Sequence, residues 1–110
     1  MELGPWQTRI GKLKSEQFEQ WLSLLREIEK SEHFDTDYWI SIAICQSKLG
    51  WYGLLKNTLD KLEDVEDPVI RHQMAKMRCR HWPSEENSKL LRASLKELLK
   101  WAKNQEENLD

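Results

Sequence analysis

Residues 37–68, DYWISIAICQSKLGWYGLLKNTLDKLEDVEDP, decide the fold of this 110-residue chain. Apolar residues recur every three or four positions on both sides of Gly50, as one face of a helix requires. Glycine suits the left-handed conformation that ends a helix, and the Asp67-Pro68 pair is a start signal for another one. The stretch therefore predicts a helical hairpin. Its two apolar stripes are Trp39, Ile42, Ala43 and Leu49, then Tyr52, Leu55, Leu59 and Leu62.

Similar signals predict helices in the rest of the chain. Ser15 is a candidate N-cap for a helix over residues 16–31, and Pro83-Ser84-Glu85-Glu86 restarts the chain before a last helix. The inward faces expected for these two helices are Phe18, Trp21, Leu22, Leu25 and Ile28 in the first, and Leu91, Leu95, Leu98 and Ala102 in the last. No alternating strand pattern competes, so we expect an all-α domain of about six helices.

The apolar stripes also repeat. A shift of 34 residues places Phe18 on Tyr52, and it carries the rest of that stripe onto Leu55, Leu59 and Leu62. The chain is therefore expected to form three antiparallel helical hairpins, at about 5–31, 36–66 and 68–104, followed by an acidic tail at 105–110. A plain helical bundle, or a piece of a larger helical-repeat protein, stays open as an alternative.

The unit from Thr36 to Pro68 resembles a tetratricopeptide repeat. The residues that carry the resemblance are Trp39, Ala43, Gly50 and Tyr52, with Pro68 one place later than the family's closing proline. Gln46, Leu55 and Leu62 depart from the family's pattern. The resemblance implies a short right-handed solenoid of stacked hairpins and a role in recognising another protein.

Composition sets the class of protein. Charged residues make up 33% of the chain and hydrophobic residues 39%, a balance that suits amphipathic helices. The two cysteines, Cys45 and Cys79, are too few for a secreted disulfide scaffold and suggest buried free thiols. The N-terminus lacks the apolar core of a signal peptide, and the most apolar window, residues 38–55, is too interrupted to span a membrane. We therefore expect an intracellular, cytoplasmic protein without membrane contact.

The sequence holds no pattern that indicates catalysis. His72, Cys79 and His81 lie in one expected helix, but their spacings of seven and two do not put three metal ligands on one face. Neither cysteine has a histidine and an acid at the spacing of an activated nucleophile, and no glycine-rich phosphate loop is present. We expect no enzyme activity, no metal and no cofactor.

Charge is concentrated in the last third of the chain. Residues 71–103 contain nine Lys or Arg and three Glu, and four of the basic residues lie in one helix: Arg71, Lys76, Arg78 and Arg80. Three interpretations stay open: a solvated face balanced by the acids of residues 60–67, a surface for an acidic protein segment, and a nucleic-acid-binding face over residues 71–103. The pI of 5.9 places nucleic acid behind the other two.

Six tryptophans are many for so small a chain. Trp21 and Trp39 fall on apolar stripes and are expected in the core, whereas Trp51 and Trp82 stand at helix joints and are candidate interface anchors. The function expected is that of an adaptor or assembly module that binds a protein partner, with self-association or membership of a longer repeat protein as further possibilities. A small helical chaperone or inhibitor subunit is the remaining alternative.

Overall fold

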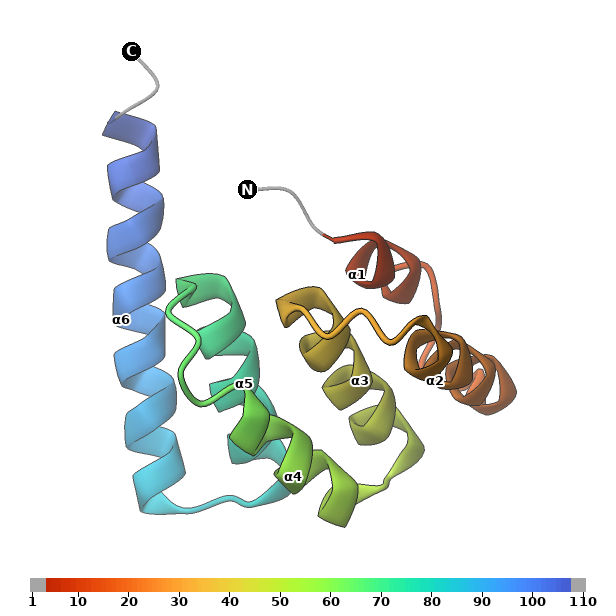
Figure 1. Cartoon of the computed structure of the whole chain (residues 1–110). Coiled ribbons are helices and arrows are strands. Elements are labelled where there is room, and N and C mark those ends of the chain that lie inside the picture. Colours follow the sequence, from red (N-terminus) through yellow and green to blue (C-terminus); the bar gives the residue numbers. More distant parts are fainter. Residues whose placement is uncertain (1–3, 108–110) are drawn as a thin grey trace. The chain divides into compact units, whose positions relative to one another are not determined.

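The computed structural model describes residues 4–107, and these residues fold into helices without strands. The prediction of an all-α fold with six helices is confirmed. The helices are α1 (Pro5–Ile10), α2 (Phe18–Ser31), α3 (Thr36–Leu49), α4 (Tyr52–Lys61), α5 (Pro68–His81) and α6 (Glu85–Glu107), labelled in Figure 1. The chain divides into two compact units, residues 1–64 with α1 to α4 and residues 65–110 with α5 and α6. That the hairpins repeat one another as in a solenoid stays a prediction.

Helix α3 is the centre of the first unit and packs against α1, α2 and α4. It is apolar nearly all round, with buried residues on every side, whereas α2 buries a single stripe. A helix of the first kind must be covered by several neighbours, and one of the second kind needs only one. The core of this unit gathers Ile10, Trp21, Leu24, Leu25, Ile28, Tyr38, Ile42, Cys45 and Leu49.

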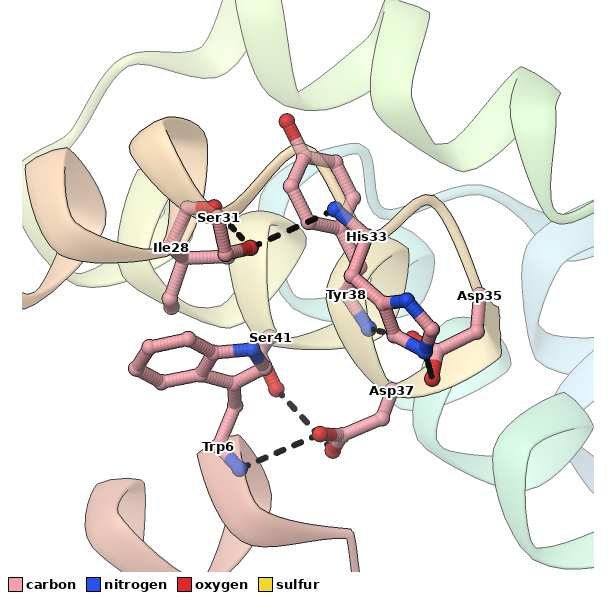
Figure 2. Close-up of polar contacts among 8 residues, drawn as sticks. All are labelled: Trp6, Ile28, Ser31, His33, Asp35, Asp37, Tyr38 and Ser41. Carbon is pink, nitrogen blue, oxygen red and sulfur yellow. Dashed lines mark hydrogen bonds and ion pairs between the residues drawn. The ribbon is translucent and has the colours of Figure 1, made fainter.

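Helix ends in this unit follow the expected chemistry in two places. The Asp35 carboxylate accepts a hydrogen bond from the Tyr38 backbone N–H at 2.8 Å and so caps α3 (Figure 2). At the other end of α3, Gly50 adopts a φ of 77°, which glycine reaches without a steric penalty. The start of α2 was wrongly predicted: the helix begins at Phe18, and the Ser15 hydroxyl lies 3.0 Å from Lys48 Nζ instead of capping.

Two residues of the expected inward faces lie outside the core. Phe18 and Tyr52 are both about half exposed, although Trp21, Leu25, Leu55 and Leu59 on the same stripes are buried. Each misplaced aromatic is the first residue of its helix, where the chain has only just turned toward the core. The repeat alignment that paired Phe18 with Tyr52 thus matched two exposed positions.

An unpredicted contact attaches α1 to α3. The Asp37 carboxylate accepts a hydrogen bond from the backbone N–H of Trp6 at 3.1 Å (Figure 2) and another from the backbone N–H of Gln7 at 3.2 Å. It therefore caps α1 from 30 residues away, while the local N-cap, Gly4, offers no side chain. The Ser41 hydroxyl lies 3.5 Å from the same carboxylate.

The second unit is a hairpin of α5 and α6. Asp67 caps α5 through the Val69 N–H at 2.9 Å, as the Asp-Pro signal predicted, and the Ser84 hydroxyl accepts from the Asn87 N–H at 3.0 Å at the start of α6. The Asn87 side-chain amide donates to the Trp82 carbonyl at 2.6 Å and closes the turn between the helices. Helix α6 has 23 residues and α5 only 14, so the end of α6 runs on past the start of α5 (Figure 1).

Candidate functional site

The six residues predicted to bind a partner are divided between the two units. Trp51 belongs to the first unit, where it packs partly buried against the core. The four basic residues of the prediction belong to α5, and Trp82 is the residue that ends that helix. Trp82 is half-buried, and its ring lies 6.0 Å from that of His81 in an edge-on arrangement.

The four basic residues of α5 separate into two pairs. Arg71 is held by Glu97 of α6, with Nε 3.2 Å from the carboxylate oxygen, and Arg78 is half-buried. Lys76 and Arg80 are exposed, and they lie one turn apart, so they share a face. Arg71 is exposed as well but is paired with Glu97, so Lys76 and Arg80 are the two exposed basic residues of α5 without an ion pair within residues 4–107.

Three side-chain contacts locate the interface between α5 and α6. His72 Nδ1 lies 3.1 Å from the hydroxyl of Ser94, and the Cys79 thiol lies 3.9 Å from the hydroxyl of Ser88. The Arg71–Glu97 ion pair closes one side of this interface, which we call the first flank. Successive residues are rotated by about 100° around a helix axis. Counted from His72, Lys76 and Arg80 therefore lie on the side of α5 away from Arg71, which we call the second flank.

The inward face of α6 differs from the predicted one. The residues of α6 that are at least partly buried are Asn87, Ser88, Leu91, Ser94, Leu98 and Trp101, and apart from Ser88 they follow a spacing of four and three. Of the predicted stripe, Leu91 and Leu98 are half-buried, but Leu95 is 42% exposed and Ala102 is exposed as well. The prediction was wrong because the side of α6 that faces α5 contains Ser94, a small polar residue that is buried and lies within hydrogen-bonding distance of His72.

Leu95 belongs to a row of three leucines that runs from the inward face of α6 to its exposed side. Leu91, Leu95 and Leu99 are one turn apart, and we call them the leucine row. Counting about 100° per residue from Ser94 puts Leu95 and Leu99 on the second flank, the side of Lys76 and Arg80. Leu99 is 61% exposed. Large aliphatic side chains in a row, left open along a helix, are typical of a surface that another chain covers.

Cations surround this row. Arg92, Lys96 and Lys103 are the polar neighbours of Leu95 and Leu99 on α6, and all three are exposed. Together with Lys76 and Arg80 of α5 they form what we call the cation rim. None of the five takes part in an ion pair within residues 4–107. The sequence analysis counted the cations of residues 71–103 together, but it named only those of α5 as candidate partner-binding residues.

Few acidic residues of α5 and α6 lie near the cation rim. Helix α5 has no Asp or Glu, and the one acid in the middle of α6, Glu97, lies on the first flank with Arg71. Glu85 lies in the first turn of α6, 3.8 Å from Lys89, and Glu106 and Glu107 are at the helix end. Four of the rim cations, Lys76, Arg80, Arg92 and Lys96, therefore have no acid one turn away on their own helix, whereas Lys103 is followed by Glu106 and Glu107.

The side chains that could do chemistry are engaged in packing. Burial raises the pKa of the Cys45 thiol to about 12, so it stays protonated and unreactive at neutral pH. The Ser94 hydroxyl donates to the Leu91 carbonyl at 2.8 Å, which is the usual back-bond of a serine within a helix. Cys79 is half-buried, where the sequence suggested a buried thiol. Within residues 4–107, no group of three His, Cys, Asp or Glu is placed to hold a metal ion.

One open hollow lies in the first unit, beside α1 and α2. Its volume is about 220 Å³, below the range of typical small-molecule pockets, and the ion pair of Arg9 and Glu27 at 2.7 Å crosses its lining. That bond holds the pKa of Glu27 below its usual range. The lining residues are Arg9, Leu13, Gln20, Ser23, Leu24 and Glu27.

Among the helices of residues 4–107, none has the length and apolarity needed to cross a membrane. Comparison of the chain with protein-family models, with curated proteins and with solved structures finds no match. The candidate functional site consists of the leucine row of α6 and the cation rim beside it.

Proposed function

We propose that this chain is a protein-binding module that engages its partner through the leucine row on α6. The observation that carries the proposal is the exposure of Leu95 and Leu99, at 42% and 61%, side by side on one face of a helix. Covering such side chains is worth about 25 cal/mol per Å² of apolar area, and a partner would supply that cover.

The build of the second unit supports this proposal. Leucines are spread over about half the circumference of α6, because Leu90 and Leu99 lie on opposite flanks of the interface with α5. A single neighbouring helix can cover only about a third of a helix surface. A third helix laid beside α5 and α6 would cover the leucine row and complete a small bundle.

The module would act as an adaptor or assembly domain without an activity of its own. Two unpaired cysteines, one of them deeply buried, suit the reducing conditions of the cytoplasm. The resemblance of residues 36–68 to a tetratricopeptide repeat is consistent with this role.

Site-specific photo-crosslinking tests the proposal. A benzophenone amino acid placed at Leu99 is expected to capture a partner from cell extract, and the same group at Leu90 should not. Leu90 is a matched control because it is 50% exposed on the same helix, on the other flank. In the chain with the probe at position 99, the additional substitution Leu95→Gln should abolish capture of the partner. The additional substitution Leu54→Gln should leave capture unchanged, since it alters a leucine of α4 that is 53% exposed. Equal capture from positions 90 and 99 would refute the leucine row as the binding surface.

A further inference from the structure

We infer that the partner segment is an acidic amphipathic helix, which lies on the second flank with its apolar stripe on the leucine row and its carboxylates against the cation rim. This inference rests on the proposed function and adds the chemistry of the partner. Its basis is charge complementarity, since the rim has five cations and the acids of α6 lie on the first flank or at the helix ends.

The geometry of the rim specifies the order of residues in the partner. Lys76 and Arg80 are one turn apart on α5, and the contacts His72–Ser94 and Cys79–Ser88 place them level with Leu91 and with the turn before it. Arg92 and Lys96 are one turn apart on α6 and border the row on its other side. A helix lying between these edges would place apolar residues at i, i+3, i+4 and i+7 in its middle. Acids would border this stripe on both sides, as charged residues border the apolar stripe of a coiled coil.

A helix is the occupant that the dimensions favour. The leucine row runs from Leu91 to Leu99 and continues to Ala102, a distance of about 16 Å at the rise of an α-helix. Three turns of a partner helix have that length. The end of α6 extends past the start of α5, so a partner helix would also cover turns that α5 does not reach (Figure 1).

Two other occupants fit these charges less well. A second copy of this chain, placed with its leucine row on the first, would bring Arg92 and Lys96 of both copies together, which like charges oppose. Nucleic acid would satisfy the rim, but phosphates gain nothing from the leucines, which occupy the centre of the surface. Both occupants are therefore outcomes of the test and not part of the inference.

The test uses a synthetic peptide of about 20 residues with leucines at helical spacing and glutamates on both borders. Its binding to the whole chain is followed by fluorescence anisotropy, beside a peptide in which every Glu is replaced by Gln. We expect the acidic peptide to bind at least about tenfold more tightly than the neutral one, and its affinity to fall as salt rises. Equal affinities for the two peptides would overturn the inference.

Charge reversal supplies the second arm. The double variant R92E/K96E should weaken binding of the acidic peptide about tenfold or more and bind a lysine-bordered version of the peptide better than the wild-type chain does. Lys100→Glu is the control, because Lys100 is exposed on the same helix and lies about 140° around the axis from Leu95, farther than Arg92 or Lys96. The altered residues are exposed, so circular dichroism and melting curves should match those of the wild type. A loss in Lys100→Glu equal to that in R92E/K96E would contradict the assigned flank.

The leucines complete the test. The double variant L95Q/L99Q should abolish peptide binding, and an unchanged affinity would overturn the inference.

Sedimentation velocity that shows a wild-type dimer, lost in L95Q/L99Q, would assign the surface to a second copy. Oligonucleotide binding that is lost in R92E/K96E and kept in L95Q/L99Q would assign the rim to nucleic acid; either result refutes the acidic helix. If crosslinking from Leu99 still depends on Leu95 while the neutral peptide binds as well as the acidic one, the proposed function stands and only the acidic chemistry fails.

Discussion

Removing the Asp37 carboxylate is expected to release α1 from the first unit. This carboxylate is the acceptor for two backbone N–H groups at the start of α1, those of Trp6 and Gln7, and it also lies in the first turn of α3. A lost N-cap costs about 1 kcal/mol, and a second charge-assisted bond together with the helix-dipole term raises the sum for Asp37→Ala to about 2–3 kcal/mol. Asp64→Ala, at an exposed position, should change stability by less than about 0.5 kcal/mol.

Gly4 gives this prediction a sharper form. A Cβ added at Gly4 would collide with the Asp37 carboxyl group, while the backbone there, with φ −67° and ψ 166°, suits any residue. Gly4→Ala should therefore be destabilising only while the carboxylate is present. In the double variant with Asp37→Ala the cost of the added methyl should disappear, so the two changes are strongly non-additive.

The assay must resolve the two units separately, because a single unfolding curve can contain both. Hydrogen exchange of individual amides, measured at increasing urea concentrations, distinguishes the unfolding of the two units. In Asp37→Ala the amides of Thr8 and Arg9 should exchange much faster, and amides of α5 and α6 should be unchanged. An Asp37→Ala variant as stable as the wild type would show that this carboxylate does not stabilise α1. Additive free energies for Gly4→Ala and Asp37→Ala would show that the residue 4 side chain does not meet the carboxylate.

Three further changes have defined outcomes. Glu32 ends α2 in the left-handed region with φ 51°, so Glu32→Gly should stabilise the first unit by about 1 kcal/mol, while Glu29→Gly within the helix should cost about as much. Cys79 should react with a thiol reagent before Cys45, whose pKa of about 12 and burial delay its reaction until the first unit opens. Burial, with a smaller contribution from Arg80, lowers the pKa of His81 below 6.5. The unfolded chain therefore binds a proton at this histidine at a higher pH than the folded chain does, so the free energy of unfolding should fall as the pH drops below 6.5. The variant His81→Gln should weaken this pH dependence.

Local signals in the sequence were enough to predict most of the elements. The Asp35 and Asp67 caps and the Gly50 terminus act through groups within three residues of one another, which is why they can be seen in the sequence. The cap that Asp37 gives to α1 joins residues 30 apart, and nothing near Asp37 distinguishes it from an ordinary first-turn acid. Gln46 was noted as a departure from the repeat, but its buried partner, the Thr58 hydroxyl at 2.6 Å, required the packing of α4 on α3.

The candidate site could be predicted only in part, and the reason lies in the composition of α6. Its leucines occupy both flanks as well as the interface, so periodicity alone allows several inward faces and cannot select the one that contains Ser94. Pairing with α5 makes that choice through His72, and the choice leaves Leu95 and Leu99 outside. The exposure of Leu95 is therefore both the error in the predicted core and part of the evidence for a binding surface. When the apolar surface of a helix is wider than its neighbour can cover, the exposed leucines either destabilise the protein or are covered by a partner. Arg92 and Lys96, which lie near Leu95 and Leu99 and have no acid one turn away, favour the second explanation.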